Sequence, residues 1–468
     1  MLSALLRTGL LDTTFLATAA VLAWTLFCPR KRIPPWAVTT GLAVMALGTA
    51  ADLGMGLYRG YAIPRDVMQD IVAAREFDAG RPMHPTDMTE LIGTMLAEEG
   101  KRPSLLYWSP SLAAREKEQY ELMLREHWVQ AHPPGMSLLT VPFVRAFGVL
   151  GTQVAFALIG MVALAVTLWL LHRELIPHIR GPILIAIALG VIGWDPVVSV
   201  LRAQQPGLLL VVLTTVAWAG LRRGEAARPG VLVAIAATLK LLPALLLVPL
   251  VAQHRRAFAV ALLALAILSL GILAVVPWTD IVDYRSTADG VVEEYAAFPG
   301  NISLHGAFAR IARAAGWSAG TAKIAWGISG SLLVAGLFWR VARAERYPVE
   351  TDRGIALSLA LLPLLSPVAW DHYLVFLLLP LAVLGRWVFA SSSRRCRIGY
   401  WALLTAFAVP DHTHLWLFEI VRASGIPVLE VGFVELFRTG LVLALVAWLF
   451  VARPTGTMIN THFPVGQP

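Results

Sequence analysis

The chain of 468 residues is 57% hydrophobic and 15% charged, and its net charge is +8. An ordinary soluble domain has roughly 25% charged residues, so this composition excludes a protein whose whole surface faces water. The positive charge does not indicate a nucleic-acid partner, because Arg and Lys sit in short clusters between apolar runs. Such clusters are topology signals of membrane proteins.

Apolar runs long enough to cross a bilayer recur along the chain. A spanning helix needs about 20 apolar residues, and only helices or closed barrels satisfy every backbone group in hydrocarbon. We therefore expect an all-α polytopic membrane protein, with residues 1–468 forming a single transmembrane unit. The longest runs lie at residues 10–27, 36–58, 150–172, 257–277, 319–340 and 431–452.

The first apolar run is expected to be a retained helix. It has no strongly basic segment before it and no small-residue cleavage site before Pro29, so it does not resemble a removed signal peptide. Cys28 and Cys396 each lie beside a basic cluster, which places them on the cytoplasmic side. Thiols stay reduced there, so we expect no disulfide.

The basic clusters also predict two extracytoplasmic loops. The helix at residues 36–58 runs outward, which places residues 59–135 outside the cytoplasm as a long polar loop. By the same reasoning, residues 278–318 form a second extracytoplasmic loop. Short helices are expected in the first loop near residues 65–79, 86–99 and 111–129.

Two apolar stretches are too interrupted to cross as single helices. Residues 133–148 contain several prolines and are expected to lie in the interface before the next full helix. Residues 229–253 begin and end near basic clusters, which fits two half-helices that meet near Lys240 and Pro243. The prediction is 11 spans plus this half-helix pair, with the N-terminus outside and the C-terminus inside.

Polar side chains gather where the predicted helices reach the outer face. A charged residue at a helix centre costs about 2.5 to 3.5 kcal/mol on the insertion scale, so such groups tend to mark a lumen or a site. The clusters are Arg65-Asp66, Asp70, Arg202 with Gln204-Gln205, Asn301 to His305, and Trp370-Asp371-His372.

Asp66 has two interpretations. It follows a membrane exit directly, where a carboxylate can act as a general base toward an acceptor hydroxyl. It also precedes a predicted helix, where an aspartate commonly caps the free N–H groups. The sequence leaves both open.

Lys240 and His372 are candidates for binding a phosphate. Lys240 lies in the middle of an apolar stretch and can bind phosphate as a point charge, or instead snorkel or bind carbonyls freed at the helix break. His372 can donate a hydrogen bond to a leaving phosphate, or its hydrogen bonds can be satisfied by capping the helix at whose start it lies. Both alternatives stay open.

No metal site or cofactor is expected. Asp411, His412 and His414 are metal-ligand types, but histidines two positions apart on a helix do not face each other. The tripeptide from Asn301 to Ser303 has the form of a glycan acceptor, and we interpret it as an incidental match.

The order and spacing of these residues resemble glycosyltransferase family 87, over about residues 60–390. No single motif carries the resemblance. The matching positions are Asp66, Gly80, His132-Pro133-Pro134, Gln204, Lys240 with Pro243, Asn301-Ile302-Ser303-Leu304, and Ser366-Pro367 followed by Trp370-Asp371-His372.

The chain departs from the family pattern at three places. Asp70 stands where the family has tyrosine in its Asp-x-x-x-Tyr motif. The segment that the family has as Gly-Gln-x-Asn ends here in Pro206, so its glutamine is kept and its asparagine is lost. The second histidine of a doublet expected after Trp-Asp is Tyr373.

The resemblance implies a C-type glycosyltransferase fold and inverting transfer of a sugar, mannose in this family, from a polyprenyl-phosphate donor to a lipid-linked or glycan acceptor. Asp66 would be the general base. The leaving phosphate needs cationic or hydrogen-bonding partners, for which Arg202, Lys240 and His372 are candidates. The implied substrate-binding residues are His132, Gln204, Asn301 and Asp371.

A transporter or flippase of a lipid-linked substrate is the alternative from another class. Transporters commonly carry internal repeats, and none is found here. Their transport path also places polar groups near the midplane, where Lys240 is the one candidate. High Arg and Ala content suggests a bacterium, and we expect a plasma-membrane protein whose active site is extracytoplasmic.

Overall fold

The computed structural model describes residues 35–62, 66–83, 85, 88–98, 132–298, 300–344, 348–390, 393–409 and 436–452. All the elements in these ranges are helices, as the sequence predicts. They are α2 (Pro35–Ala62), α3 (Val67–Asp78), α4 (Met88–Glu98), α6 (Pro134–Leu175), α7 (Pro182–Ile192), α8 (Asp195–Ala203), α9 (Gly207–Arg222), α10 (Ala227–Leu239), η1 (Leu242–Leu246), α11 (Leu247–Gln253), α12 (Arg255–Val275), α13 (Trp278–Tyr295), α14 (Leu304–Ala314), α15 (Ala319–Ala342), α16 (Pro348–Leu365), η2 (Asp371–Leu377), α17 (Leu378–Ala390), α18 (Arg394–Phe407) and α21 (Phe437–Val451).

The described part of the chain does not confirm the predicted 11 membrane spans. Within the described ranges, five helices are long and apolar enough to cross a bilayer, and six if α7 and α8 form one span bent by 49°. Four further apolar helices are shorter than a full span, among them α9 and α21. α9 begins directly after Pro206, and the helix that follows α10 begins around Pro243, so proline limits the length of these helices.

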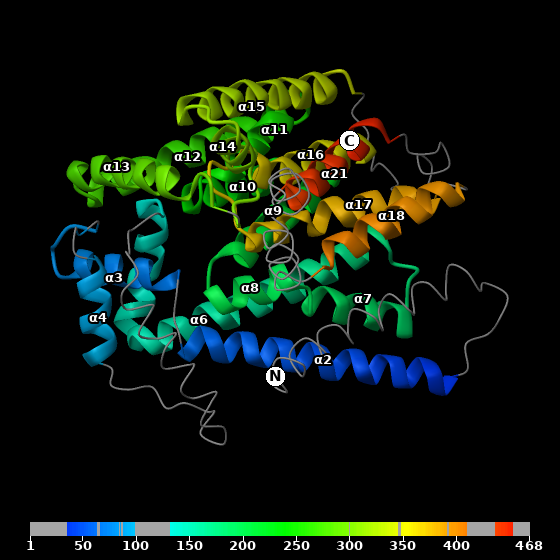
Figure 1. Ribbon diagram of the computed structural model, residues 1–468, viewed down its shortest axis with the longest axis horizontal. Coiled ribbons are helices and arrows are strands. Elements are labelled where there is room, and N and C mark those ends of the chain that lie inside the picture. Colours follow the sequence, from blue (N-terminus) through cyan, green and yellow to red (C-terminus); the bar gives the residue numbers. More distant parts are fainter. Residues whose placement is uncertain are drawn as a thin grey trace.

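Most of the long helices run along one axis of the molecule, with α2 and α15 on opposite sides (Figure 1). The short helices α3 and α4 and the polar helix α13 gather at one end of this axis. They belong to the two predicted outer loops. The sequence predicted α3 and α4 to within a few residues but did not predict α13 or α14, and the helix predicted near 111–129 lies outside the described residues.

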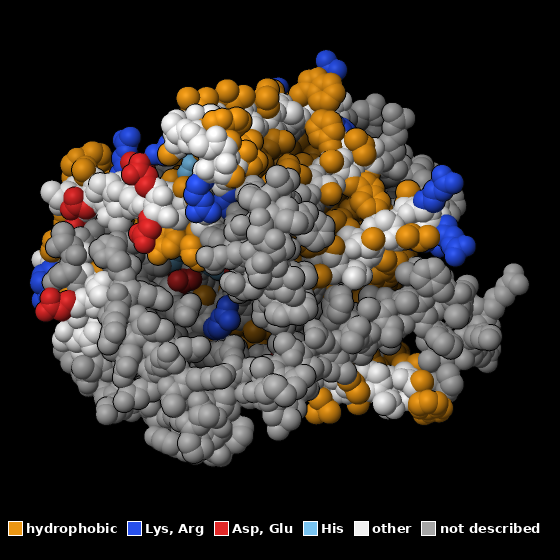
Figure 2. All heavy atoms as spheres, viewed as in Figure 1, with side chains coloured by type: hydrophobic (Ala, Val, Ile, Leu, Met, Phe, Trp, Pro, Cys, Tyr) orange, Lys and Arg blue, Asp and Glu red, His pale blue; other side chains and the backbone are white. Residues whose placement is uncertain are grey.

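The core and the apolar surface divide between different helices. α16 is buried almost throughout, and Trp218 of α9 packs in the same cluster with no exposed surface. α15 instead exposes large apolar side chains such as Ile324 and Leu332. Hydrophobic side chains cover this surface in Figure 2. Such a large exposed apolar surface fits contact with lipid.

Both interrupted stretches break where the sequence predicts. α6 loses helical geometry at Gly148, which has φ +65° and separates the first turns from the long membrane helix. α10 ends at Leu239, and Lys240 is extended with φ −150° and ψ 126° before η1 begins. An extended residue between two helices frees backbone groups and turns its side chain away from both helix surfaces.

A buried group of ion pairs joins the end of α9 to the end of α6 and the start of α16. Arg222 of α9 lies 3.5 Å from Glu174 of α6 and 3.1 Å from Asp352 of α16. Trp218 donates its indole N–H to Asp352 at 2.8 Å, and Arg386 of α17 donates to the Glu174 carbonyl. The sequence assigned these helix ends to one side of the membrane, and they lie together.

Candidate functional site

The predicted site residues come from six separate segments, and the structure brings five of these segments together. The contacts run between the start of α3, the segment just before α6, the end of α8, the end of α10 and the start of η2. Three helix starts and two helix ends therefore converge on one polar cluster, which we call the polar site. Its members are Asp66, Asp70, His132, Arg202, Gln204, Gln205, Lys240, Asp371, His372 and Tyr373.

Asp66 occupies the N-cap position of α3 but does not cap the helix. Its backbone is helical, with φ −53° and ψ −34°, and its side chain accepts no bond from the first turn of the helix. The carboxylate instead accepts a hydrogen bond from Nε2 of Gln205 at 2.6 Å. Of the two interpretations of Asp66, the structure disfavours the cap.

The sequence placed Gln205 in a polar cluster but gave it no role at the site. Its carboxamide uses both ends, since Nε2 donates to Asp66 and Oε1 lies 3.4 Å from the Lys240 ammonium. It thereby bridges a carboxylate on α3 and a cation at the end of α10. Only its place in a glutamine doublet at the family's Gly-Gln position could have pointed to it.

Gln204 sets the direction of the chain at this point. It has φ +55° and is the one non-glycine residue with positive φ in the described ranges. A left-handed residue that is not glycine is strained, and such strain clusters at functional sites. The reversal ends α8 and places the next side chain, Gln205, against Asp66. The buried Oε1 of Gln204 has no hydrogen-bond partner among the described residues.

Lys240 directs its ammonium into the polar site. Besides its contact with Gln205, Nζ lies 4.4 Å from the centre of the Tyr373 ring. A cation over an aromatic face is stabilised by roughly 0.5 to 2 kcal/mol, depending on exposure. The lysine therefore has two partners inside the site, which argues against snorkelling.

His372 is buried near three other basic side chains. It is 6% exposed, and Lys240, His132 and Arg202 all interact with it electrostatically. Its Nδ1 lies 3.8 Å from Asp371, while Nε2 has no hydrogen-bond partner in the described part of the chain. A buried polar atom without a partner is costly, and a bound ligand would satisfy it.

His132 and Asp70 form a buried pair. Nδ1 of His132 lies 2.7 Å from Oδ2 of Asp70, and both side chains are more than nine-tenths buried. Asp70 lies one helical turn after Asp66, so the two carboxylates share a face of α3. Arg202, at the end of α8, donates to Ser199 at 3.3 Å.

Asn301 has a different role from the predicted one. Its Nδ2 lies within 3.3 Å of three backbone carbonyls, and its Oδ1 accepts from the backbone N–H of Ser303 and of Ala369. The carboxamide is thus used by the backbone and has no capacity left for a substrate. Asn301 acts on the site indirectly, by fixing the loop that leads from Pro367 to Asp371.

Helix α13 brings an aromatic side chain to the same region. Tyr284 lies close enough to Tyr373 for the two phenols to interact. Burial raises the pKa of Tyr284, and the neighbouring Tyr373 raises it further. The phenol therefore stays protonated and neutral at physiological pH.

No group of three metal-ligand side chains occurs among the described residues. Asp411, His412 and His414 lie outside them, so the expectation for that segment stays a prediction.

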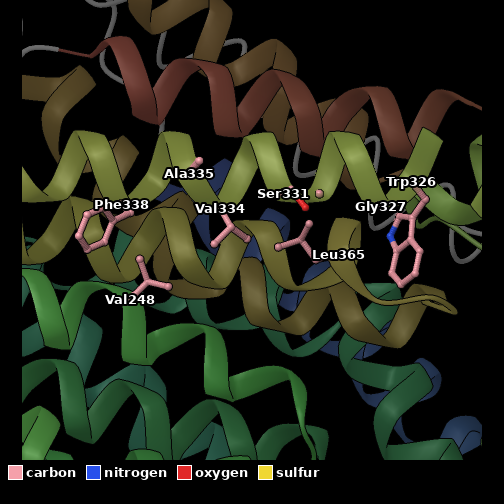
Figure 3. Close-up of a pocket in the computed structure, with 9 residues that line it drawn as sticks. Val248, Trp326, Gly327, Ser331, Val334, Ala335, Phe338 and Leu365 are labelled. Carbon is pink, nitrogen blue, oxygen red and sulfur yellow. The ribbon is translucent and has the colours of Figure 1, made fainter. Parts of the chain in front are cut away.

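An apolar groove of about 660 Å³ lies elsewhere, along α15 (Figure 3). Val248 of α11 and Leu365 of α16 line it together with α15 residues from Trp326 to Phe338. None of the predicted site residues reaches this groove.

Comparison with known proteins supports the resemblance. The sequence model of glycosyltransferase family 87 matches residues 130–367, slightly more than half of the chain. The match contains His132, Lys240 and the glutamine doublet, and it ends before Asp371. No curated protein and no solved structure matches the chain, so the C-type fold stays a prediction. The family match, the apolar helices and the polar site together show that this chain belongs to glycosyltransferase family 87.

Proposed function

We propose that this membrane glycosyltransferase transfers mannose from a polyprenyl-phosphate donor to a hydroxyl of a lipid-linked or glycan acceptor. The reaction takes place at the extracytoplasmic face of a bacterial plasma membrane and inverts the anomeric configuration. Asp66 is the general base, and Arg202, Lys240 and His372 hold the phosphate of the donor.

The bridge that Gln205 forms between Asp66 and Lys240 is the observation that carries this proposal. One amide keeps a carboxylate and an ammonium within reach of a single small ligand. Sugar transfer from a lipid phosphate needs both groups, because a proton leaves the acceptor while negative charge develops on the phosphate. A site for binding and transport alone has no need of a base beside the phosphate.

The chemical step follows from this arrangement. The acceptor oxygen attacks the anomeric carbon while Asp66 takes the hydroxyl proton. The bond between the anomeric carbon and the phosphate oxygen breaks, and its electron pair leaves with the lipid phosphate. Lys240 and Arg202 stabilise the second negative charge that this phosphate acquires, and Nε2 of His372 gains the partner that it lacks in the described structure.

The remaining predicted residues bind the substrate and take no part in the bond changes. Gln204 has a buried Oε1 that can accept a hydrogen bond from a sugar hydroxyl. Asp371, which lies beside His372, can accept such a bond as well. His132 borders the phosphate position. Asn301 is no longer in the substrate-binding set, since its bonds are all with the backbone.

The test uses the full-length protein in lipid nanodiscs with polyprenyl-phosphate mannose labelled in the sugar and membrane extract as the source of acceptor. We expect sugar to move to acceptor and polyprenyl phosphate to accumulate, and Asp66→Asn to stop both. A transporter gives the opposite result: the intact donor crosses the bilayer of proteoliposomes, and its sugar bond is not broken.

A further inference from the structure

We propose that the apolar groove along α15 binds a glycerophospholipid of the surrounding bilayer. One acyl chain of this lipid lies in the groove, and its ester carbonyl accepts a hydrogen bond from the indole N–H of Trp326. This second site is separate from the polar site, and its ligand is not a substrate of the proposed reaction.

Trp326 brings a buried donor without an acceptor to the groove. Its Nε1 is shielded from water and has no hydrogen-bond partner in the described part of the chain. Figure 3 shows this nitrogen on the side of the ring that faces Ser331 and Leu365, which also line the groove. A buried N–H that stays unbonded is costly, and an indole can only donate. The groove therefore suits a ligand that carries an acceptor.

The indole is packed so that its N–H keeps this direction. The ring of His305 lies 5.3 Å from the ring of Trp326, measured between centroids. His305 is itself buried, and its Nδ1 lies 3.2 Å from the carbonyl oxygen of Pro367. A fixed neighbour on one side of the indole limits its rotation, so the donor is oriented before a ligand binds.

The rest of the groove suits a hydrocarbon chain. Val334 and Phe338 line it from α15, and Val248 and Leu365 line it from α11 and α16. None of the described residues that line it is charged, so an anionic group would not be compensated inside it. From Trp326 to Phe338 the helix rises about 18 Å at 1.5 Å per residue. This is close to the depth of one hydrocarbon leaflet, roughly 15 Å.

A cation lies just beyond the end of the groove that Trp326 forms. Lys323 lies one helical turn before Trp326 on the same face of α15. Its ammonium is paired with Glu293 at 2.8 Å, but both side chains are about half exposed or more, and an exposed pair of this kind contributes little. Along α15 a cation, a neutral N–H donor and an apolar groove thus follow one another. A glycerophospholipid carries its phosphate, ester and acyl chain in the same order.

The position of the groove makes the bilayer the source of this lipid. α15 is long and apolar enough to span the membrane, and Ile324, Ile328 and Leu332 beside the groove are each more than half exposed. Such a surface faces lipid, so a chain can enter the groove sideways from the bilayer. Trp326, near the start of the spanning helix, lies at the depth where tryptophan is enriched and where lipid esters are found.

Other occupants leave the indole N–H unsatisfied. The isoprenyl chain of the proposed sugar donor is a hydrocarbon without an acceptor. A helix from a second copy of this chain uses its backbone carbonyls within the helix. The acyl ester is the bilayer group that combines a neutral acceptor with a long apolar chain.

The experiment compares two lipids that differ only in the ester carbonyls. Native mass spectrometry measures binding of a diacyl phosphatidylglycerol, and of its dialkyl ether analogue, to the full-length protein. We expect the wild type to bind the diacyl lipid roughly 2- to 10-fold more tightly, the contribution of one neutral hydrogen bond. Trp326→Phe, which keeps a ring and removes the N–H, should lose this preference by weakening the diacyl lipid alone. Lys323→Gln should weaken both lipids to the same extent.

A matched pair of glycine variants assigns the binding to the groove. A Cβ added at Gly327 meets no heavy atom within 4 Å, and the same is true of Gly336 on the same helix. Gly327 lines the groove, whereas Gly336 does not. We expect Gly327→Leu to lose the lipid that shows the ester preference, and Gly336→Leu to keep it.

The possible results separate this inference from its rivals. Equal affinity of the wild type for the two lipids overturns it, and so does an unchanged ester preference in Trp326→Phe or in Gly327→Leu. Displacement of the bound phospholipid by an equal concentration of polyprenyl phosphate would assign the groove to the donor tail, and a dimer that excludes lipid would assign it to a second copy. If the lipid effects appear but no sugar is transferred, the inference stands and only the proposed reaction fails.

Discussion

Nε2 of Gln205 donates to the carboxylate of Asp66 at 2.6 Å, although the two residues are 139 positions apart in the sequence. Asp66 sits where a helix cap is expected and makes no cap bond. A carboxylate held by one amide donor keeps its second oxygen for another partner. This geometry suits a base that must meet an acceptor hydroxyl.

The first prediction concerns Asp66→Asn, which keeps the size of the side chain and removes its basicity. We expect turnover to fall roughly 10²- to 10⁴-fold, the usual contribution of a general base. Thermal stability should change little, because no cap bond is lost. The measurement is sugar transfer at saturating donor, with a melting curve for each variant.

Asp70→Asn is the companion variant. Its carboxylate is engaged by His132, so the loss of turnover at saturating donor should be milder than for Asp66→Asn. Wild-type turnover in Asp66→Asn together with a dead Asp70→Asn protein would show that Asp70 is the base.

The second prediction concerns the bridge itself. Gln205→Leu keeps the approximate volume of the side chain but removes its contacts with Asp66 and Lys240. We expect kcat/KM to fall about 10- to 100-fold, since the short bond to the Asp66 carboxylate is worth about 1.5 to 3 kcal/mol. Gln153→Leu, which removes another buried amide outside the polar site, is the control for packing. Equal losses in the two variants would mean that the effect is structural.

The third prediction separates the two contacts of Lys240. Lys240→Met removes the charge and should lower kcat/KM for the donor, mainly through KM if the ammonium binds the phosphate in the ground state. Tyr373→Phe keeps the ring face under the ammonium and should be neutral. Tyr373→Leu removes that face and should cost roughly 2- to 30-fold, in line with a cation–π contact of 0.5 to 2 kcal/mol. A neutral Lys240→Met variant over a donor titration would remove the lysine from the site.

Local signals in the sequence predicted two breaks in the helices. Lys240 beside Pro243, and Gly148 after a proline-rich stretch, interrupt helices where the sequence alone suggested. Asp66 could also be found, because it follows a membrane exit at the family's spacing from Gly80. Such features depend on a few neighbouring residues, which a single sequence contains.

The contacts between distant segments could not be predicted in this way. The pairing of Asp70 with His132 joins residues 62 positions apart, and it depends on how α3 packs against α6. The left-handed backbone at Gln204 decides that Gln205 reaches Asp66, and no propensity of glutamine favours that conformation. Asn301 was predicted to bind substrate by its motif, but the carbonyls that occupy it come from the packed loop around Pro367.

The fourth prediction tests the orientation of the chain in the membrane. In a variant with Cys28 and Cys396 replaced by serine, Ser286→Cys on the exposed surface of α13 should react with an impermeant thiol reagent in intact cells. Arg394→Cys, in the basic cluster at the start of α18, should react only after permeabilisation. The reverse pattern would invert the proposed topology and place the polar site in the cytoplasm.

The fifth prediction concerns the ion pair between Arg222 and Asp352 at the helix ends opposite the site. Both side chains are at most 5% exposed, and the pair lies at 3.1 Å. Arg222→Met leaves the Asp352 carboxylate without its nearest cation, and removing one member of a buried pair typically costs about 3 to 5 kcal/mol. Asp352→Asn in the same chain removes the stranded charge and keeps an acceptor for the Trp218 indole.

We therefore expect Arg222→Met to melt well below the wild type and the double variant to regain most of the loss. Turnover of the folded fraction should stay near the wild-type value in both, because none of the polar-site contacts involves these residues. The measurement is a melting curve in nanodiscs together with turnover at a temperature where every variant is folded. Loss of activity at unchanged stability would show instead that the charges at this end take part in the reaction.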